Sequence, residues 1–158
     1  GTIFQVYLPR SFEAEPVAVN EPKPPRELRG KETVLLVEDH AALREMTSAM
    51  LQAQGYTVLK AAHAGEAERI CREHKDHIDL VLTDVVMPEV SGPELAKRLQ
   101  RLRPGVRLIY TSGYTDNPAL REDVLKHNLP FLQKPYGQSE LLGKVREVLD
   151  TPVATPTT

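Results

Sequence analysis

The sequence predicts an α/β fold in which five strands alternate with five helices and form a doubly wound parallel sheet. From Thr33 onward, short apolar runs alternate with segments whose apolar residues have helical spacing. In residues 79–88, a Leu- and Val-rich run typical of a strand buried on both faces is stopped by Asp84 and Pro88. Finally, 41% of the 158 residues are apolar, enough for the core of one ordinary domain.

The predicted elements follow one another without an internal repeat. Strands are expected at residues 33–37, 56–61, 79–83, 106–110 and 130–133. Helices are expected at residues 41–54, 66–73 and 94–102, then in a short segment begun by Asn117 and Pro118, and last in a segment capped by Ser139. The first helix should turn Leu43, Met46, Met50 and Ala53 to one face and stop at Gly55.

The chain divides into four predicted parts. Residues 1–10 alternate like a strand, which cannot form a domain alone and suggests the end of a preceding one. Residues 11–32 mix Pro with Glu and have little apolar periodicity, so we expect a linker. Residues 33–150 form the α/β domain, and the Thr- and Pro-rich residues 151–158 are expected to be a disordered tail.

Composition excludes several classes of function. The net charge is −2 and Lys and Arg do not cluster, which argues against a nucleic-acid partner. No apolar run approaches the roughly 20 residues that cross a bilayer, so direct membrane contact is not expected. The single cysteine, Cys71, falls on an apolar helical face and is interpreted as core packing. A reducing compartment, and hence the cytosol, is the predicted location of the domain.

Residues with chemical function gather where the predicted strands end. Glu38-Asp39, Asp84, Thr111 and Lys134 end or follow four different strands, and in a parallel sheet these ends share one edge. The plain alternative for Asp84 is a residue that only opens a loop. Three neighbouring carboxylates repel unless a cation neutralises them, and Mg²⁺ prefers such oxygen ligands. With a lysine and a hydroxyl beside them, the group predicts a phosphoryl-binding site.

Five short motifs occur in a specific order: Leu35-Leu36-Val37-Glu38-Asp39, Leu82-Thr83-Asp84-Val85-Val86-Met87-Pro88, the following Gly92, Thr111-Ser112-Gly113, and Phe131-Leu132-Gln133-Lys134-Pro135. On these motifs, residues 33 to about 149 resemble the receiver domain of two-component response regulators. The resemblance implies a flavodoxin-like three-layer fold that accepts a phosphoryl group from a phosphohistidine in a phosphorelay and switches conformation.

The resemblance also implies a role for each residue of the motifs. Asp84 would be the phosphoacceptor, with Mg²⁺ (or Mn²⁺ as the alternative ion) held by Glu38, Asp39, Asp84 and the backbone carbonyl of Val86. Lys134 would contact the phosphoryl group, Thr111 and Phe131 would form the switch, and Pro135 would follow a cis peptide bond. Glu38 replaces a common Asp, and Phe131 lacks the hydroxyl often found at its position, which puts a hydrogen-bonded rotamer switch in doubt.

The opening residues 1–10 resemble the last strand of the ATP-binding domain of sensor histidine kinases. A receiver placed after that strand implies a hybrid sensor histidine kinase, whose whole chain would be a kinase and could be anchored in a membrane. The implied partners are a histidine-kinase dimerisation domain or a histidine phosphotransfer protein. Dimerisation on phosphorylation, and self-catalysed loss of the phosphoryl group, are left open.

Two other functions remain as alternatives. The first is a Mg²⁺-dependent phosphatase or phosphotransferase that acts on small molecules through an aspartyl-phosphate. Such enzymes usually carry a second Asp two residues after the nucleophile, where this chain has Val86. The second alternative is a stand-alone single-domain response regulator, since only eight residues follow Asp150.

Overall fold

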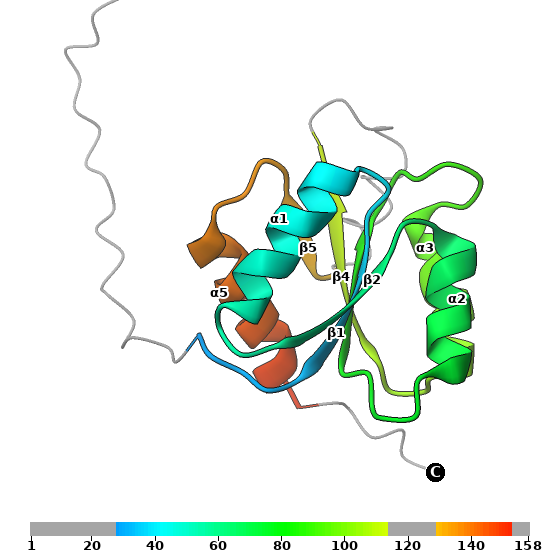
Figure 1. Cartoon of the computed structure of the whole chain (residues 1–158), viewed down its shortest axis with the longest axis horizontal. Helices are drawn as coiled ribbons and strands as arrows, with labels where there is room; N and C mark the ends of the chain where they lie inside the picture. Colours follow the sequence, from blue (N-terminus) through cyan, green and yellow to red (C-terminus); the bar gives the residue numbers. More distant parts are fainter. Residues whose placement is uncertain (1–27, 114–128, 153–158) are drawn as a thin grey trace, which may run out of the picture.

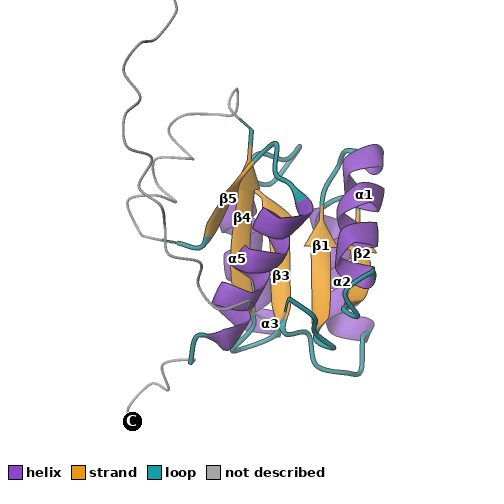
Figure 2. Cartoon of the chain, turned by 90° about the vertical axis from the view of Figure 1, so that its left-hand side faces the viewer, coloured by secondary structure: helices purple, strands orange, loops and turns teal. Residues whose placement is uncertain are grey.

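A parallel sheet with the strand order β2-β1-β3-β4-β5 lies between two layers of helices (Figures 1 and 2). The computed structural model describes residues 28–113 and 129–152. The strands are β1 (Thr33–Val37), β2 (Thr57–Ala61), β3 (Leu80–Asp84), β4 (Arg107–Ser112) and β5 (Phe131–Gln133). The helices are α1 (Ala41–Gln52), α2 (Ala64–Glu73), α3 (Gly92–Leu102) and α5 (Gln138–Asp150). The predicted doubly wound fold is confirmed, and the helix expected from Asn117 lies outside the described residues.

The sheet is buried on both faces because alternate residues of its central strands enter different cores. In β1, Val34 and Leu36 pack with α1 and α5, whereas Leu35 packs on the opposite face with α2 and α3. Figure 1 shows these two helix pairs on opposite sides of the sheet. Cys71 is buried in the α2–α3 core, as predicted. Such continuous apolar strands are typical of parallel sheets covered by helices.

The buried face of α1 differs from the predicted one. Met46 is 45% exposed, and the residues that α1 buries are Thr47, Ser48 and Leu51. The helix is therefore rotated relative to the predicted stripe, so that a threonine faces the core. This is possible because the Thr47 hydroxyl has a buried hydrogen-bond partner, the Tyr136 hydroxyl.

The ends of the helices also show which predictions hold. The predicted cap of α5, Ser139, is wrong: Gly137 is the N-cap, and its N–H donates to Glu140 Oε2 over 2.8 Å. Because α5 begins at Gln138, Glu140 occupies the third helical position, from which its carboxylate reaches back to the N–H of the N-cap residue. The N-cap of α1 is His40. Its Nδ1 accepts a hydrogen bond from the backbone N–H of Leu43 at 3.4 Å.

The amino edge of the sheet is fastened by ion pairs and by the residues before β1. Arg146 of α5 pairs with Glu32 and with Asp150, four residues further along the helix. The Tyr56 hydroxyl donates to the carbonyl of Leu28 and lies 3.4 Å from the Arg146 guanidinium. The last residues of the predicted linker, from residue 28 onward, therefore contact the domain.

Candidate functional site

The predicted acidic residues meet at the carboxyl edge of the sheet. Glu38 directly follows β1, and Asp84 is the last residue of β3, one position later than the predicted strand end. One carboxylate oxygen each from Glu38, Asp39 and Asp84 lie within 4.8 Å of one another. Glu38 is 3% exposed and Asp84 is 7% exposed, whereas Asp39 is exposed. The sheet thus brings these three carboxylates together although up to 46 residues separate them along the chain.

Lys134 reaches this cluster from the end of β5. Its Nζ lies 2.6 Å from Glu38 Oε2 and 2.5 Å from Asp84 Oδ2. Its backbone N–H donates to the carbonyl of Ser112 in β4 over 2.8 Å. The peptide bond between Lys134 and Pro135 is cis, as predicted. One ammonium group therefore bridges two carboxylates from neighbouring strands.

The electrostatics of the cluster follow from its burial. Burial raises the pKa of the Glu38 carboxyl above its ordinary value, although the hydrogen bond from Lys134 acts in the opposite direction. Burial acts to lower the pKa of Lys134, but its hydrogen bonds to Asp84 and Glu38 outweigh this and raise that pKa. Lys134 is therefore held as an ammonium ion. Because three carboxyl groups face a single lysine, the charge of the cluster still favours binding of a further cation.

The remaining predicted residues lie at different places around Asp84. Thr111 is paired with Asp84 in the register of β3 and β4, and its hydroxyl donates to the carbonyl of Thr83 over 3.5 Å. The backbone N–H of Val86 donates to Asp84 Oδ1 over 3.3 Å. Phe131 packs in a separate apolar cluster with Val85, Ala96 and Tyr110. A role for the Val86 carbonyl as a metal ligand, and the switch formed by Thr111 and Phe131, stay predictions.

The loop after β3 approaches its own strand closely. A Cβ atom on Gly92 would lie 2.1 Å from the carbonyl oxygen of Asp84, which is too close for any side chain. The backbone N–H of Gly92 also donates to the carbonyl of Val85 over 2.9 Å. Gly92, part of the predicted motif, therefore lets α3 begin directly beside the end of β3.

Sequence reasoning missed two contacts that support the site. The Arg44 guanidinium donates to the backbone carbonyls of Glu38, at 2.6 Å, and Asp39, at 3.3 Å, which braces the acidic turn. The Tyr136 hydroxyl lies 3.1 Å from Thr47 Oγ1 and ties the turn that follows Lys134 to α1. A threonine at core spacing in α1 was the available signal, because a buried hydroxyl needs a partner.

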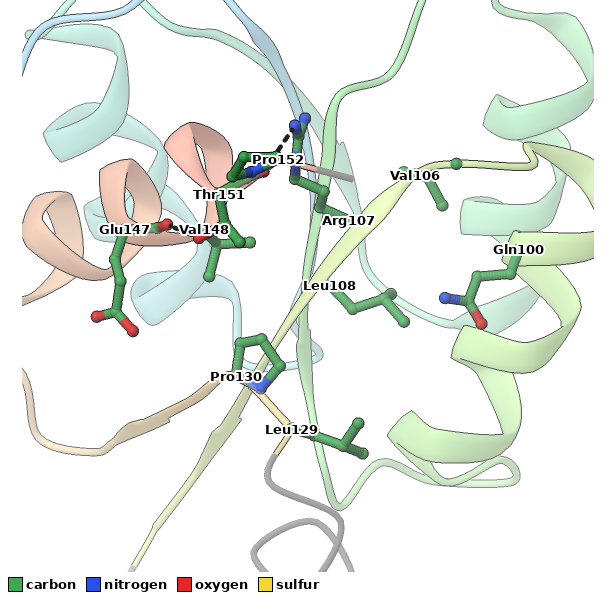
Figure 3. Close-up of a pocket in the computed structure, with 11 residues that line it drawn as sticks. Gln100, Val106, Arg107, Leu108, Leu129, Pro130, Glu147, Val148, Thr151 and Pro152 are labelled. Carbon is green, nitrogen blue, oxygen red and sulfur yellow. Dashed lines mark hydrogen bonds between the residues drawn. The ribbon is translucent and has the colours of Figure 1, made fainter. Parts of the chain in front are cut away.

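A cavity of about 460 Å³ lies away from the carboxylates, over β4 and between α3 and α5. Figure 3 shows Leu108, Pro130 and Val148 around it, with Gln100 on one side and Glu147 on the other. The described residues that line it are mainly apolar and include no cluster of the groups that perform phosphoryl chemistry. The carboxyl edge is therefore the candidate site.

The fold and the site define a flavodoxin-like domain with a buried aspartate, a lysine and an acidic cluster at the carboxyl edge of its sheet. Residues 34–146 match the family described as the response regulator receiver domain. The chain belongs to this family, which functions in two-component signalling. The alternative of a small-molecule phosphatase is thereby set aside.

Individual relatives agree with this membership. The chain is 40% identical, over 95% of its length, to the sensor kinase CckA of Brucella abortus, of which it spans only 17%. It is 27% identical to the response regulator receiver protein CpdR of the same organism, over 73% of this chain and 95% of that protein. The crystal structure of the receiver domain from the hybrid histidine kinase CckA superposes with a TM-score of 0.61 at 31% identity, over 74% of this chain and 98% of that one.

Among residues 28–113 and 129–152, no helix is both long enough and apolar enough to cross a membrane.

Proposed function

We propose that this domain accepts a phosphoryl group on the Asp84 carboxylate. The observation that carries the proposal is the position of Asp84, buried at the end of β3 with its Oδ2 2.5 Å from the Lys134 ammonium group. In the proposed step, an Asp84 oxygen attacks the phosphorus of a phosphohistidine. A P–O bond forms, the P–N bond breaks, and the imidazole leaves with the electron pair.

Each neighbour of Asp84 has a defined part in this proposal. Glu38, Asp39 and Asp84 offer a set of oxygen ligands that suits Mg²⁺, with Mn²⁺ as the alternative. The bound ion would supply positive charge for the phosphoryl oxygens. Lys134 would exchange its contact with a carboxylate for one with the phosphoryl group, and the Thr111 hydroxyl would turn from Thr83 toward the same group. Phe131, the first residue of β5, would respond by repacking its side chain.

Asp84→Asn tests the proposed acceptor. Incubation of the wild-type chain with acetyl phosphate and Mg²⁺ should add one phosphoryl group, measured by intact-mass spectrometry. Asp84→Asn should abolish this addition, whereas the matched variant Asp76→Asn, at an exposed position before β3, should leave it unchanged. Undiminished labelling of the Asp84→Asn protein contradicts the proposal.

We further propose that the domain belongs to a hybrid sensor histidine kinase. The family match covers residues 34–146, whereas the alignment with the sensor kinase CckA covers 95% of the chain and therefore includes most of the flanking residues. This supports the prediction that residues 1–10 end a kinase ATP-binding domain and residues 11–32 link it to the receiver. The domain would then work where the kinase core does, in the cytosol.

The partner would dock beside Lys134. A pocket of about 330 Å³ lies between α1 and the turn after β5, lined by Leu43, Met46, Gly113, Lys134, Pro135 and Tyr136. An apolar surface on a histidine phosphotransfer protein or a dimerisation domain would fit it. Met46→Lys should slow transfer from such a phosphorylated protein about tenfold while labelling by acetyl phosphate stays unchanged. Equal effects on both donors would remove this pocket from docking.

A further inference from the structure

The lysine of the site sits on a short connection that offers few backbone restraints. The strand before it, β5, has three residues and, among the strands that the structure describes, pairs only with β4. Between Lys134 and the first residue of α5, Gln138, there are three residues. Pro135 carries no N–H and cannot extend the ladder of hydrogen bonds. Beyond the hydrogen bond from its own N–H to the carbonyl of Ser112, the position of the lysine therefore depends on how this turn is anchored to the rest of the domain.

Tyr136 provides that anchor. Its side chain is 8% exposed and packs in the core cluster shared by α1, α5 and the sheet. Its hydroxyl lies 3.1 Å from Thr47 Oγ1, and Thr47 is fully buried in α1. Removing either hydroxyl would take this buried hydrogen bond from the other, so the pair helps to fix the position of the turn relative to α1.

In addition to the ion pairs of Lys134, this hydrogen bond links the acidic turn and α1 to the turn that follows the lysine. The acidic turn of Glu38 and Asp39 leads directly into α1, and Arg44 of α1 holds the carbonyls of that turn. Tyr136 stands two residues after Lys134. The Thr47–Tyr136 bond therefore joins the helix behind the carboxylates to the turn behind the lysine. Because this bond does not involve the Lys134 ammonium group, it would still hold the turn after that group leaves a carboxylate.

We propose that Tyr136 and Thr47 are positioning residues that keep Lys134 within reach of the phosphoryl group as it forms on Asp84. The inference rests on the proposed phosphorylation of Asp84 and concerns its rate. The hydrogen bond between Thr47 and Tyr136 itself involves no carboxylate of the acidic cluster. Their loss should therefore slow phosphoryl transfer and leave binding of Mg²⁺ as it is.

The test compares Tyr136→Phe with Tyr56→Phe. Tyr56 is the matched control because it is also buried, at 3%, and its hydroxyl also makes a hydrogen bond to the protein, but at the amino edge of the sheet. With saturating Mg²⁺, Tyr136→Phe should slow labelling by acetyl phosphate about three- to tenfold, the fold-change that corresponds to one hydrogen bond. Tyr56→Phe should label at the wild-type rate. The dissociation constant of Mg²⁺ should stay within about twofold of wild type in both.

Thr47→Val provides the second half of the test. This variant keeps the shape of the side chain and removes the same hydrogen bond from the other side, so it should slow labelling as Tyr136→Phe does. The double variant should be no slower than either single one, because the two substitutions break one bond. Additive losses, a wild-type rate in Tyr136→Phe, or equal slowing by Tyr56→Phe each overturn the inference. A wild-type chain that takes no label instead overturns the proposed function itself.

Discussion

The two edges of the sheet each hold one cation between two carboxylates. At the carboxyl edge, Lys134 lies 2.6 Å from Glu38 and 2.5 Å from Asp84. At the amino edge, Arg146 lies 2.7 Å from Glu32 and pairs also with Asp150. In their ion pairs alone, these two groups of side chains are alike. Burial and the surplus of charge distinguish them.

The carboxyl edge keeps two of its three clustered carboxylates out of water. The side chains of Glu38 and Asp84 are 4% and 10% exposed, and Asp39 adds a third carboxylate beside them. At the amino edge, the side chains of Glu32 and Asp150 are 26% and 42% exposed. Concentrating buried negative charge costs stability, so the charge arrangement at the carboxyl edge is the one expected of a ligand site, whereas the ion pair of Arg146 with Glu32 at the amino edge fastens α5 to the residues before β1.

Replacing the cation at each edge should give the largest difference between the two edges, measured as the rate of labelling by acetyl phosphate. Lys134→Met should slow labelling by acetyl phosphate about 100-fold, as the loss of a preorganised charge at a reacting centre does. Arg146→Met should leave the rate within about twofold of wild type, because it changes only the distant fastening. The rates come from intact-mass time courses. If both variants were slowed alike, the division of roles between the edges would be wrong.

The stabilisation by Mg²⁺ should also distinguish the two edges, with a smaller effect. If the dissociation constant is ~1 mM, about 10 mM Mg²⁺ should add roughly 1.4 kcal/mol to the free energy of unfolding. Asp39→Ala should lose this gain, whereas Glu32→Ala should keep it, since of these two residues Asp39 alone belongs to the carboxyl-edge cluster. Urea unfolding with and without the ion measures both. A full gain in Asp39→Ala would place Mg²⁺ elsewhere.

Titration of Glu32 should give the smallest effect. Burial acts to raise the pKa of Glu32, but the hydrogen bond and the charge of Arg146, together with backbone hydrogen bonds, outweigh it, so this pKa is lowered on folding. A lowered pKa stabilises the fold above the ordinary value for Glu, and the stabilisation is lost as the pH falls through the folded-state pKa. Because solvent screens the pair, Glu32→Gln should cost on the order of 0.5 kcal/mol near pH 7. The cost should shrink toward zero in acid unfolding curves; a cost independent of pH would exclude the ion pair as its cause.

The sequence was sufficient to predict the sheet and the convergence of the site, because the ends of parallel strands share one edge whatever their distance along the chain. Glu38, Asp39, Asp84 and Lys134 meet there as expected. The predicted buried face of α1 is wrong, because the burial of Thr47 depends on a hydrogen-bond partner, Tyr136, that lies 89 residues away along the chain. Likewise, the cap at Gly137 depends on a contact with Glu140 that residue preferences do not reveal.

The most direct test of the account locates the phosphoryl group itself. Borohydride reduces an aspartyl-phosphate to homoserine, which marks the modified residue permanently. After labelling with acetyl phosphate and Mg²⁺, the reduced wild-type chain should carry homoserine at position 84 when its peptides are sequenced by mass spectrometry. Homoserine at position 39, or at any carboxylate outside the carboxyl edge, would contradict the assignment of Asp84 as the phosphoacceptor.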